Sequence, residues 1–270
     1  MKFSVLLSIY HKEKPDYFDR CMQSIWGEQT VKPNEIVIVE DGRLTEELYI
    51  CLGEWEKKIG SSLKRIVLKE NKGLGKALNI GVKQCSYEFV ARMDTDDISY
   101  PYRFEKQIQV LRNKDIDICS SWVNEFELDE HDITSCKKLP EHNLELIVYA
   151  KKRNPLNHPV VMYKKSIVQN AGGYKDMPGF EDYYLWVRMM KEGAKFYNIQ
   201  EPLVNMRAGY GQIERRSGLK YAISELKFQK ELLKLKFITL SEFIQNITIR
   251  FISRVLPKYL LKKIYSRIRT

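Results

Sequence analysis

Four short apolar runs, rich in Val, Ile, Leu and aromatic side chains, mark the first part of the chain. They are Phe3–Ile9, Glu35–Glu40, Leu63–Leu68 and Tyr87–Met93. Their length and composition are typical of buried β-strands. Apolar residues at helical spacing follow Pro15 and recur from Leu74 to Cys85. This alternation predicts a mostly parallel, Rossmann-like α/β sheet with helices on both faces.

The pattern is less regular beyond residue 113. Short β-like runs at Ile116–Trp122, Pro159–Tyr163 and Lys195–Ile199 alternate there with helical stretches, which predicts an α+β region. In parallel sheets, ligands bind outside the carboxyl ends of the strands. The strand ends of the first half are therefore the places where chemistry is expected.

The net charge of +10 is concentrated at the end of the chain, because residues 250–270 hold seven basic and no acidic side chains. Apolar residues in 257–268 and in the segment before it recur at helical spacing. We therefore expect 216–270 to form a helical tail with basic amphipathic helices, which bind in the plane of an anionic membrane surface. Packing of this tail on its own domain is the alternative. Nucleic acid is not expected as a partner, because no aromatic base-stacking platform accompanies the charges.

Other compositional features bear on the compartment. The five cysteines include no C-x-x-C pair, so neither a disulfide framework nor a zinc ribbon is expected. No apolar run reaches the roughly 18 residues that a membrane-spanning helix needs. We expect a cytoplasmic protein that is peripheral on the cytoplasmic face of the inner membrane.

The densest group of carboxylates follows the fourth apolar run, where Asp94, Asp96 and Asp97 lie within four positions. Crowded like charges are unfavourable unless they are neutralised, and a divalent cation with oxygen ligands does this well. Such a cation stabilises the charge that develops on a departing diphosphate. A solvated acidic turn that caps the next helix is the alternative interpretation.

Two further acidic positions occur beside predicted elements. Asp41 ends the second apolar run just before Gly42, and a carboxylate there could accept the imide N–H of uracil. Alternatively, it belongs to an ordinary strand-to-helix turn. Glu181 and Asp182 enter a helix with an aromatic face. A carboxylate there could take a proton from an attacking hydroxyl, or it could simply be favoured by the helix dipole.

As an ordered set, these pieces resemble the family 2 glycosyltransferases, which have the GT-A fold. The resemblance covers about residues 2–210 and rests on Ser4–Tyr10, Glu40–Gly42, Asn71–Gly73, Met93–Asp97 and Glu181–Asp182. It implies a GT-A domain over 1–215, with a nucleotide-sugar-binding half (1–113) and an acceptor-binding half (114–215).

The resemblance also implies residue roles. The donor would be held by Ser8, Tyr10, Asp41, Asn71 and Asp94. Asp96 would ligate Mn²⁺ or Mg²⁺, and Asp182 would be the catalytic base. The segment Asn157–Met162 is similar to bacterial members that build O-antigen or exopolysaccharide repeat units on polyprenol diphosphate, so His158 would contact the diphosphate or the metal. A purely structural His158 is the alternative.

The implied reaction is a single, inverting addition, because the Q-x-x-R-W motif of processive members is replaced by Leu-Trp-Val-Arg-Met at 185–189. One hexose, galactose or glucose, would pass from a UDP-sugar to a diphospho-undecaprenol-linked N-acetylhexosamine and form a β-linkage. A sugar nucleotidyltransferase and a non-catalytic membrane-binding module are the rival interpretations. The former should have a glycine-rich loop near its start, and Ser8–Lys12 contains no glycine.

Overall fold

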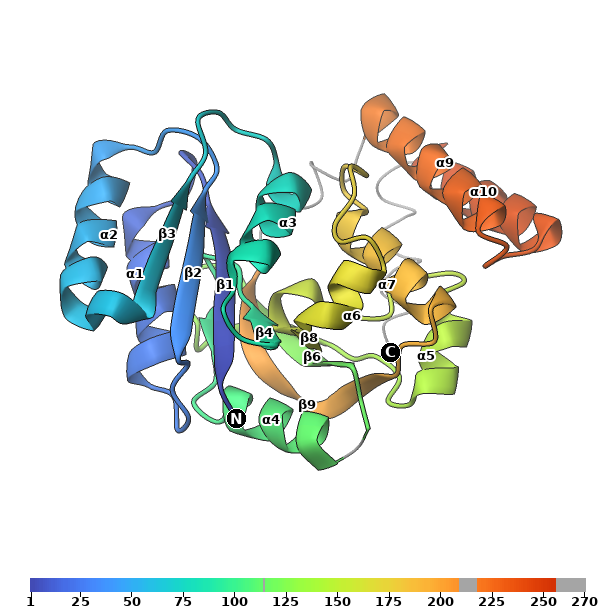
Figure 1. Ribbon diagram of the computed structural model, residues 1–270. Helices are drawn as coiled ribbons and strands as arrows, with labels where there is room; N and C mark the ends of the chain where they lie inside the picture. The colour runs from blue at the N-terminus through green and yellow to red at the C-terminus, as the bar shows by residue number, and fades with distance from the viewer. Residues whose placement is uncertain (114, 209–217, 256–270) are drawn as a thin grey trace. The chain divides into compact units, whose positions relative to one another are not determined.

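The structure is a computed structural model that describes residues 1–113, 115–208 and 218–255 (Figure 1). Residue contacts divide the chain into two compact units, Met1–Gly209 and Tyr210–Thr270, which are described separately. The domain boundary predicted at residue 215 falls among residues 209–217, outside the described residues.

A nine-stranded sheet forms the centre of the first unit, in the order β3-β2-β1-β4-β8-β6-β9-β5, with β7 paired to β6. Its strands are β1 (Phe3–Ile9), β2 (Glu35–Glu40), β3 (Leu63–Val67), β4 (Phe89–Arg92), β5 (Ile98–Ser99), β6 (Ile118–Phe126), β7 (Ile133–Lys137), β8 (Met162–Lys164) and β9 (Phe196–Arg207). Strands β1 to β4 pair in parallel. Strand β8 is antiparallel to both β4 and β6, and it thereby joins the two halves of the sheet.

The helices of the first unit are α1 (Pro15–Met22), extended by the π-helical turn η1 (Gln23–Gly27), α2 (Glu46–Ile59), η2 (Gly60–Ser62), α3 (Leu74–Gln84), α4 (Arg103–Asn113), α5 (Asn143–Tyr149), η3 (His158–Val160), α6 (Lys165–Asn170) and α7 (Glu181–Lys191). Figure 1 shows α1 and α2 on one face of β1 and β2, with α3 on the other. The GT-A-like mixed α/β architecture expected from the sequence is therefore confirmed.

The two faces of the parallel strands follow the period of two that strand geometry requires. Val5 and Ile38 belong to the fully buried cluster that includes side chains of α1 and α2. Leu6 and Val39, at the alternate positions, instead approach Gly81 of α3. A Cβ atom at Gly81 would lie 2.4 Å from Leu6 Cδ1 and 2.8 Å from Val39 Cγ2, so glycine lets α3 pack closely against the sheet.

Most predicted strands agree with the structure apart from their ends. The strand predicted over Pro159–Tyr163 is wrong in its first part, where the 3-10 turn η3 (His158–Val160) precedes β8. Strand β9 shows the largest difference in length. It continues to Arg207, eight residues beyond the predicted end at Ile199. Pro202 interrupts its sequence pattern, and the pairing with β6 shifts in register between Ser121 and Trp122, which is opposite Pro202. A bulge of this kind accommodates a residue that lacks an N–H donor, so the strand passes through a proline that normally ends one.

The second unit contains α9 (Gly218–Lys234) and α10 (Leu240–Val255). Asn246 donates to Gln229 Oε1 at 3.1 Å, and Arg250 forms an ion pair with the buried Glu225. Arg250, one of the seven basic residues of 250–270, therefore has its charge balanced within the unit. The amphipathic helix predicted over 257–268 lies outside the described residues. Among the helices that are described, none is both long and apolar enough to span a bilayer.

Two helical glycines give a matched test of how closely α3 packs against the sheet. Gly81→Ala should lower the free energy of unfolding by roughly 1–3 kcal/mol, because the new methyl group overlaps Leu6 and Val39. Gly53→Ala, in α2, has nothing within 4 Å of its Cβ position and should be stabilising by up to about 1 kcal/mol through helix propensity. Chemical denaturation measures both changes. Equal effects of the two substitutions would contradict the close approach of α3 to the sheet.

Candidate active site

The carboxyl ends of β1, β2 and β4 lie at one edge of the sheet, because these strands are parallel and in register. Ile9 pairs with Glu40, and Leu6 pairs with Arg92. Tyr10, Asp41 and Asp94 follow these strands directly, so the first acidic positions reach the same edge. Ser8 is half-buried within β1.

Asp41 organises a loop that comes from a distant part of the chain. Its Oδ1 accepts from the Lys72 amide at 2.6 Å and its Oδ2 from the Gly73 amide at 2.9 Å. The side-chain amide of Asn71 donates to the Asp41 carbonyl at 3.1 Å. Gly42, with φ +87°, allows this contact, because a Cβ there would lie 2.8 Å from the Asn71 nitrogen. A carboxylate has about four acceptor positions, so Asp41 retains capacity for a ligand.

Arg92 is a buried cation at the end of β4, with 1% of its surface exposed. Its guanidinium forms an ion pair with Asp94, while Nε and Nη1 have no hydrogen-bond partner in the described part of the chain. The backbone around it is fixed on two sides. Its N–H donates to Val161 O at 2.9 Å, and the buried Arg103 donates to its carbonyl at 2.6 Å.

Asp94, Asp96 and Asp97 belong to one turn after β4, which we call the acidic turn. Asp96 and Asp97 are its other two carboxyl groups. Burial, and then the negative charge of Asp94, raise the pKa of Asp96 to about 6. Burial, with the charges of Asp96 and Asp94, raises the pKa of Asp97 well above its ordinary value. Asp97 Oδ1 accepts from the Arg207 amide at 2.8 Å, and Arg207 Nε donates to Asp96 O at 3.2 Å. The end of β9 therefore fastens the turn.

The donor set fits a divalent cation that is shared with a substrate better than one held by protein alone. No three His, Cys, Asp or Glu side chains converge around a common point among the residues that the structure describes. Magnesium-type cations in phosphate-handling sites typically take one or two carboxylates together with phosphate oxygens. Asp96 supplies one such carboxylate, and burial, followed by the charge of Asp94, raises its pKa. Asp94 is already paired with Arg92.

A second pair of carboxyl groups lies at the start of α7. Asp182 Oδ2 accepts from the side-chain amide of Asn154 at 2.6 Å, and burial raises the pKa of Asp182. Burial and the charge of Asp182 raise the pKa of Glu181 to about 7. Glu181 Oε2 is buried and has no partner among the described residues. These groups have the raised basicity that proton-transfer sites require.

His158 belongs to an aromatic cluster. Its Nε2 lies 3.0 Å from the Tyr174 hydroxyl, and its ring centroid is 5.7 Å from that of Tyr174 and 5.9 Å from that of Trp186. Burial, and then the positive charge of Arg92, lower the pKa of His158 well below its ordinary value. The imidazole is therefore neutral at physiological pH and keeps a lone pair.

Arg92 connects the acidic turn with the start of α7. Besides burial, its charge contributes to the pKa of Asp96, Glu181 and Asp182, lowering each of them. Arg92 is thus paired with Asp94 and acts through its charge on three other predicted residues, Asp96, His158 and Asp182.

Sequence reasoning gave no role to Arg92, Asn154 or Tyr174. Arg92 carries a usable signal, since it is a cation at the end of an apolar strand immediately before three carboxylates. Asn154 and Tyr174 carry none, because their contacts span 28 and 16 residues.

The fold and the site define a GT-A-type glycosyltransferase. Residues 4–169 match the family described as Glycosyl transferase family 2, and the chain belongs to this family. This assignment decides against the sugar nucleotidyltransferase and the non-catalytic membrane-binding module.

Full-length relatives support the assignment. The chain is 40% identical to an Escherichia coli protein named UDP-Gal:alpha-D-GlcNAc-diphosphoundecaprenol beta-1,3-galactosyltransferase, over 98% of this chain and 97% of the relative. It is 37% identical to the amylovoran biosynthesis glycosyltransferase AmsE of Erwinia amylovora, over 98% of each chain.

Solved structures share the fold. Staphylococcus aureus TarS 1-349 in complex with UDP-GlcNAc matches with a TM-score of 0.67 at 17% identity, over 92% of this chain and 70% of that one. The mannosyltransferase PcManGT of Pyrobaculum calidifontis, in complex with GDP-Man and Mn²⁺, matches with a TM-score of 0.65 at 13% identity. The match covers 99% of this chain and 80% of that one.

The pKa of Glu181 predicts a pH-dependent effect on stability. Its folded-state value of about 7 lies above the ordinary 4.5, so the folded protein binds more protons than the unfolded chain between these values. The contribution of Glu181 to stability is therefore present below pH 4.5 and is lost as the pH rises through 7. As the pH rises from 5 to 8, the free energy of unfolding of wild type should therefore fall by roughly 1–3 kcal/mol relative to that of Glu181→Gln.

Denaturant titrations of both proteins at several pH values measure this difference. Asp176→Asn is the control, since Asp176 is a nearby carboxylate whose side chain is 64% exposed. A Glu181→Gln difference that is the same at pH 5 and pH 8 would contradict the assigned burial of this carboxyl group.

Proposed function

We propose that the protein transfers one hexose, galactose or glucose, from a UDP-sugar to an N-acetylhexosamine linked to diphospho-undecaprenol. The reaction inverts the anomeric configuration and yields a β-linkage in the assembly of a polysaccharide repeat unit, such as that of an O-antigen. The observation that carries this proposal is the full-length similarity to the E. coli β-1,3-galactosyltransferase. The similarity to AmsE, whose name refers to amylovoran biosynthesis, supports a biosynthetic role for the transfer.

Asp182 is the base in this proposal. Burial raises its pKa, which makes the carboxylate a stronger proton acceptor, and the amide of Asn154 fixes one of its oxygens at 2.6 Å. The acceptor hydroxyl would lose its proton to Asp182 as its oxygen attacks the anomeric carbon. Inversion follows from this single displacement on the face opposite the leaving diphosphate.

The donor lies at the strand-end edge in this proposal. Ser8, Tyr10, Asp41 and Asn71 hold the nucleoside side, and Asp94 contacts the ribose or the sugar. Support comes from the shared parallel edge and from the loop that Asp41 and Asn71 form together.

Asp96 would hold Mn²⁺ or Mg²⁺, and His158 would contact the metal or the diphosphate. When bound, the cation neutralises charge on the departing UDP. The neutral state of His158 supports its part, because a protonated imidazole cannot ligate a metal. Tyr174 engages Nε2, so Nδ1 is the atom proposed to reach the ligand.

The acceptor lipid implies a place at the cytoplasmic face of the inner membrane. We propose peripheral attachment to an anionic surface through the basic C-terminal tail. The sequence of 250–270 supports this with its excess of positive charge, although Arg250 is paired with Glu225 and contributes less than the others.

Asp182→Asn should lower kcat for transfer by about 100-fold or more while the KM for the UDP-sugar changes little, because an amide cannot accept the hydroxyl proton. The assay follows UDP release and product formation with a synthetic GlcNAc- or GalNAc-diphospholipid. Asp176→Asn is the matched control and should keep near wild-type kcat. Near wild-type transfer by Asp182→Asn would assign the base to another group.

Asp96→Ala should abolish the stimulation of transfer by Mn²⁺ and weaken Mn²⁺ binding by at least about tenfold, because a cation that shares few protein ligands depends on each of them. Electron paramagnetic resonance of free Mn²⁺ in the presence of UDP measures binding independently of turnover. Asp132→Ala removes an exposed carboxylate elsewhere and serves as the control. Unchanged Mn²⁺ binding in Asp96→Ala would remove Asp96 from the metal site.

A further inference from the structure

The net charge of the chain belongs entirely to its second unit. Of the 45 Lys and Arg residues, 14 lie in 210–270, whereas only four of the 35 Asp and Glu residues lie there. Residues 1–209 therefore hold 31 groups of each sign and are formally neutral, and the second unit carries the full +10. A unit with this excess of positive charge attracts an anionic partner.

Helix α9 separates buried from exposed positions along two opposite stripes. The buried stripe consists of Glu225, Phe228, Gln229 and Leu232. The exposed stripe consists of Ile223, Leu226, Lys227, Lys230 and Lys234. Lys234 is paired with Glu231, whereas Lys227 and Lys230 form no ion pair with any residue that the structure describes. The exposed stripe thus combines aliphatic side chains with two uncompensated cations.

Helix α10 carries exposed aliphatic side chains in a run without charge. No residue of 243–249 is acidic or basic. Leu240 and Ile244, one helical turn apart, are 62% and 56% exposed. The charged residues on either side of the run make contacts within the unit, because Glu242 belongs to the cap of the helix and Arg250 is in an ion pair. Exposed apolar side chains of this kind gain free energy in a less polar surrounding.

The exposed aliphatic side chains of the two helices share one side of the helix pair. Gln229 contacts Asn246, and Glu225 contacts Arg250, so position rises along α9 as it falls along α10 and the pair is antiparallel. With these contacts between the helices, the rotation of about 100° per residue places the exposed aliphatic residues of both helices on the same side. They are Ile223 and Leu226 of α9 and Leu240 and Ile244 of α10. We call them, with Lys227 and Lys230, the hairpin face.

We propose that the hairpin face docks on an anionic lipid bilayer. Its aliphatic side chains enter the boundary between headgroups and acyl chains, and its lysines, whose alkyl stems lie along apolar surface, reach the lipid phosphates. This inference goes beyond the attachment proposed for 250–270, because it assigns the contact to residues of α9 and α10. It does not depend on which sugar is transferred.

Two other partners fit the observations less well. A second copy of the chain, bound through the same face, would bring two units of +10 together, which like-charge repulsion disfavours. Nucleic acid would satisfy the charge, but the apolar members of the hairpin face are all aliphatic and offer no ring on which a base can stack.

Co-sedimentation with lipid vesicles measures docking without turnover. The full-length protein should bind vesicles of phosphatidylglycerol and phosphatidylcholine at low salt, and bind pure phosphatidylcholine much more weakly. Leu240→Ser/Ile244→Ser should weaken binding to the anionic vesicles by about tenfold through lost apolar burial. Lys227→Gln/Lys230→Gln should weaken it by about tenfold through lost attraction to the phosphates. Wild-type binding by both variants would overturn the proposal.

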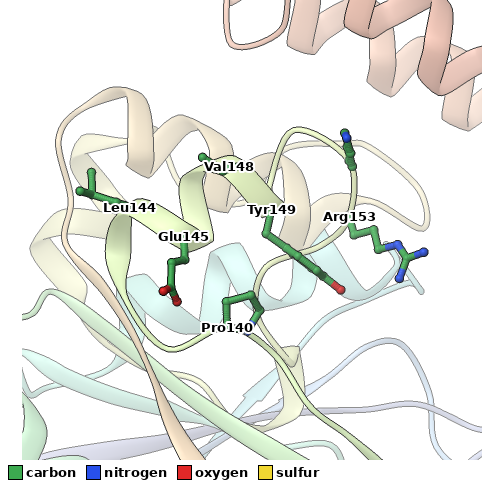
Figure 2. A pocket seen from close by; sticks show the side chains of 7 residues that line it. Pro140, Leu144, Glu145, Val148, Tyr149 and Arg153 are labelled. Carbon is green, nitrogen blue, oxygen red and sulfur yellow. The ribbon is translucent and has the colours of Figure 1, made fainter. Parts of the chain in front are cut away.

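Helix α5 supplies the matched apolar control. Its Leu144 and Val148 also lie one helical turn apart, beside a pocket (Figure 2), and are 76% and 65% exposed. They belong to the formally neutral unit, so Leu144→Ser/Val148→Ser should bind anionic vesicles as wild type does. Lys57→Gln/Lys58→Gln, which removes two exposed cations of α2, is the charge control. Equal losses in the control and hairpin-face variants would contradict a contact specific to this face.

Further outcomes separate the hairpin face from its rivals. If Lys262→Gln/Lys263→Gln weakens vesicle binding and the hairpin-face variants do not, the attachment proposed for 250–270 stands and the present proposal is wrong. If wild type ignores anionic vesicles at low salt but binds single-stranded DNA, the partner is nucleic acid and the proposal is likewise wrong. These titrations need neither sugar donor nor acceptor, so a failure of the proposed transfer leaves their result unchanged.

Discussion

A guanidinium group with 1% of its surface exposed needs compensation from its surroundings, because an unpaired charge is costly in a protein interior. Arg92 meets this requirement through its ion pair with Asp94. It lies at the end of β4, where the parallel strands meet the antiparallel β8. The acidic turn comes from the first side of that junction, and Asp182 comes from the other. The arrangement of the active site thus depends on how one buried positive charge is balanced.

The same constraint accounts for the pKa pattern. Burial raises the pKa of Asp96, Asp97 and Asp182, and the charge of Arg92 opposes this only in part. One cation cannot compensate all of them. Asp94 forms the ion pair, whereas Asp97, bonded to a backbone amide, has a pKa well above its ordinary value. Asp96, with a pKa of about 6, is mostly ionised at physiological pH. The turn then carries buried negative charge, which a divalent cation would stabilise.

Local patterns were sufficient to predict the parallel half of the fold. Strands β1 and β2 begin and end where their apolar runs do, because a buried strand between two helical layers consists almost entirely of apolar residues. Prediction was weaker where distant segments decide the outcome. The continuation of β9 through Pro202 depends on a bulge opposite β6. The sequence likewise placed acidic residues at the carboxyl ends of the strands. It could not identify Asn154 as the partner of Asp182, since that hydrogen bond joins residues 28 positions apart.

The two sides of the candidate site differ in how they are held. One side consists of regular strands whose shared edge fixes side-chain positions through backbone pairing. The side that carries His158 and Asp182 consists of short elements that side chains tie together. Arg188, for example, donates to the Ala171 and Gly173 carbonyls and so holds the loop that carries Tyr174 near His158. Such ties hold the short elements in place while leaving exposed surfaces free to vary without disturbing the sheet. The fold can therefore persist at 17% identity, as it does between this chain and TarS, because substitutions outside the sheet leave its strand pairing unchanged.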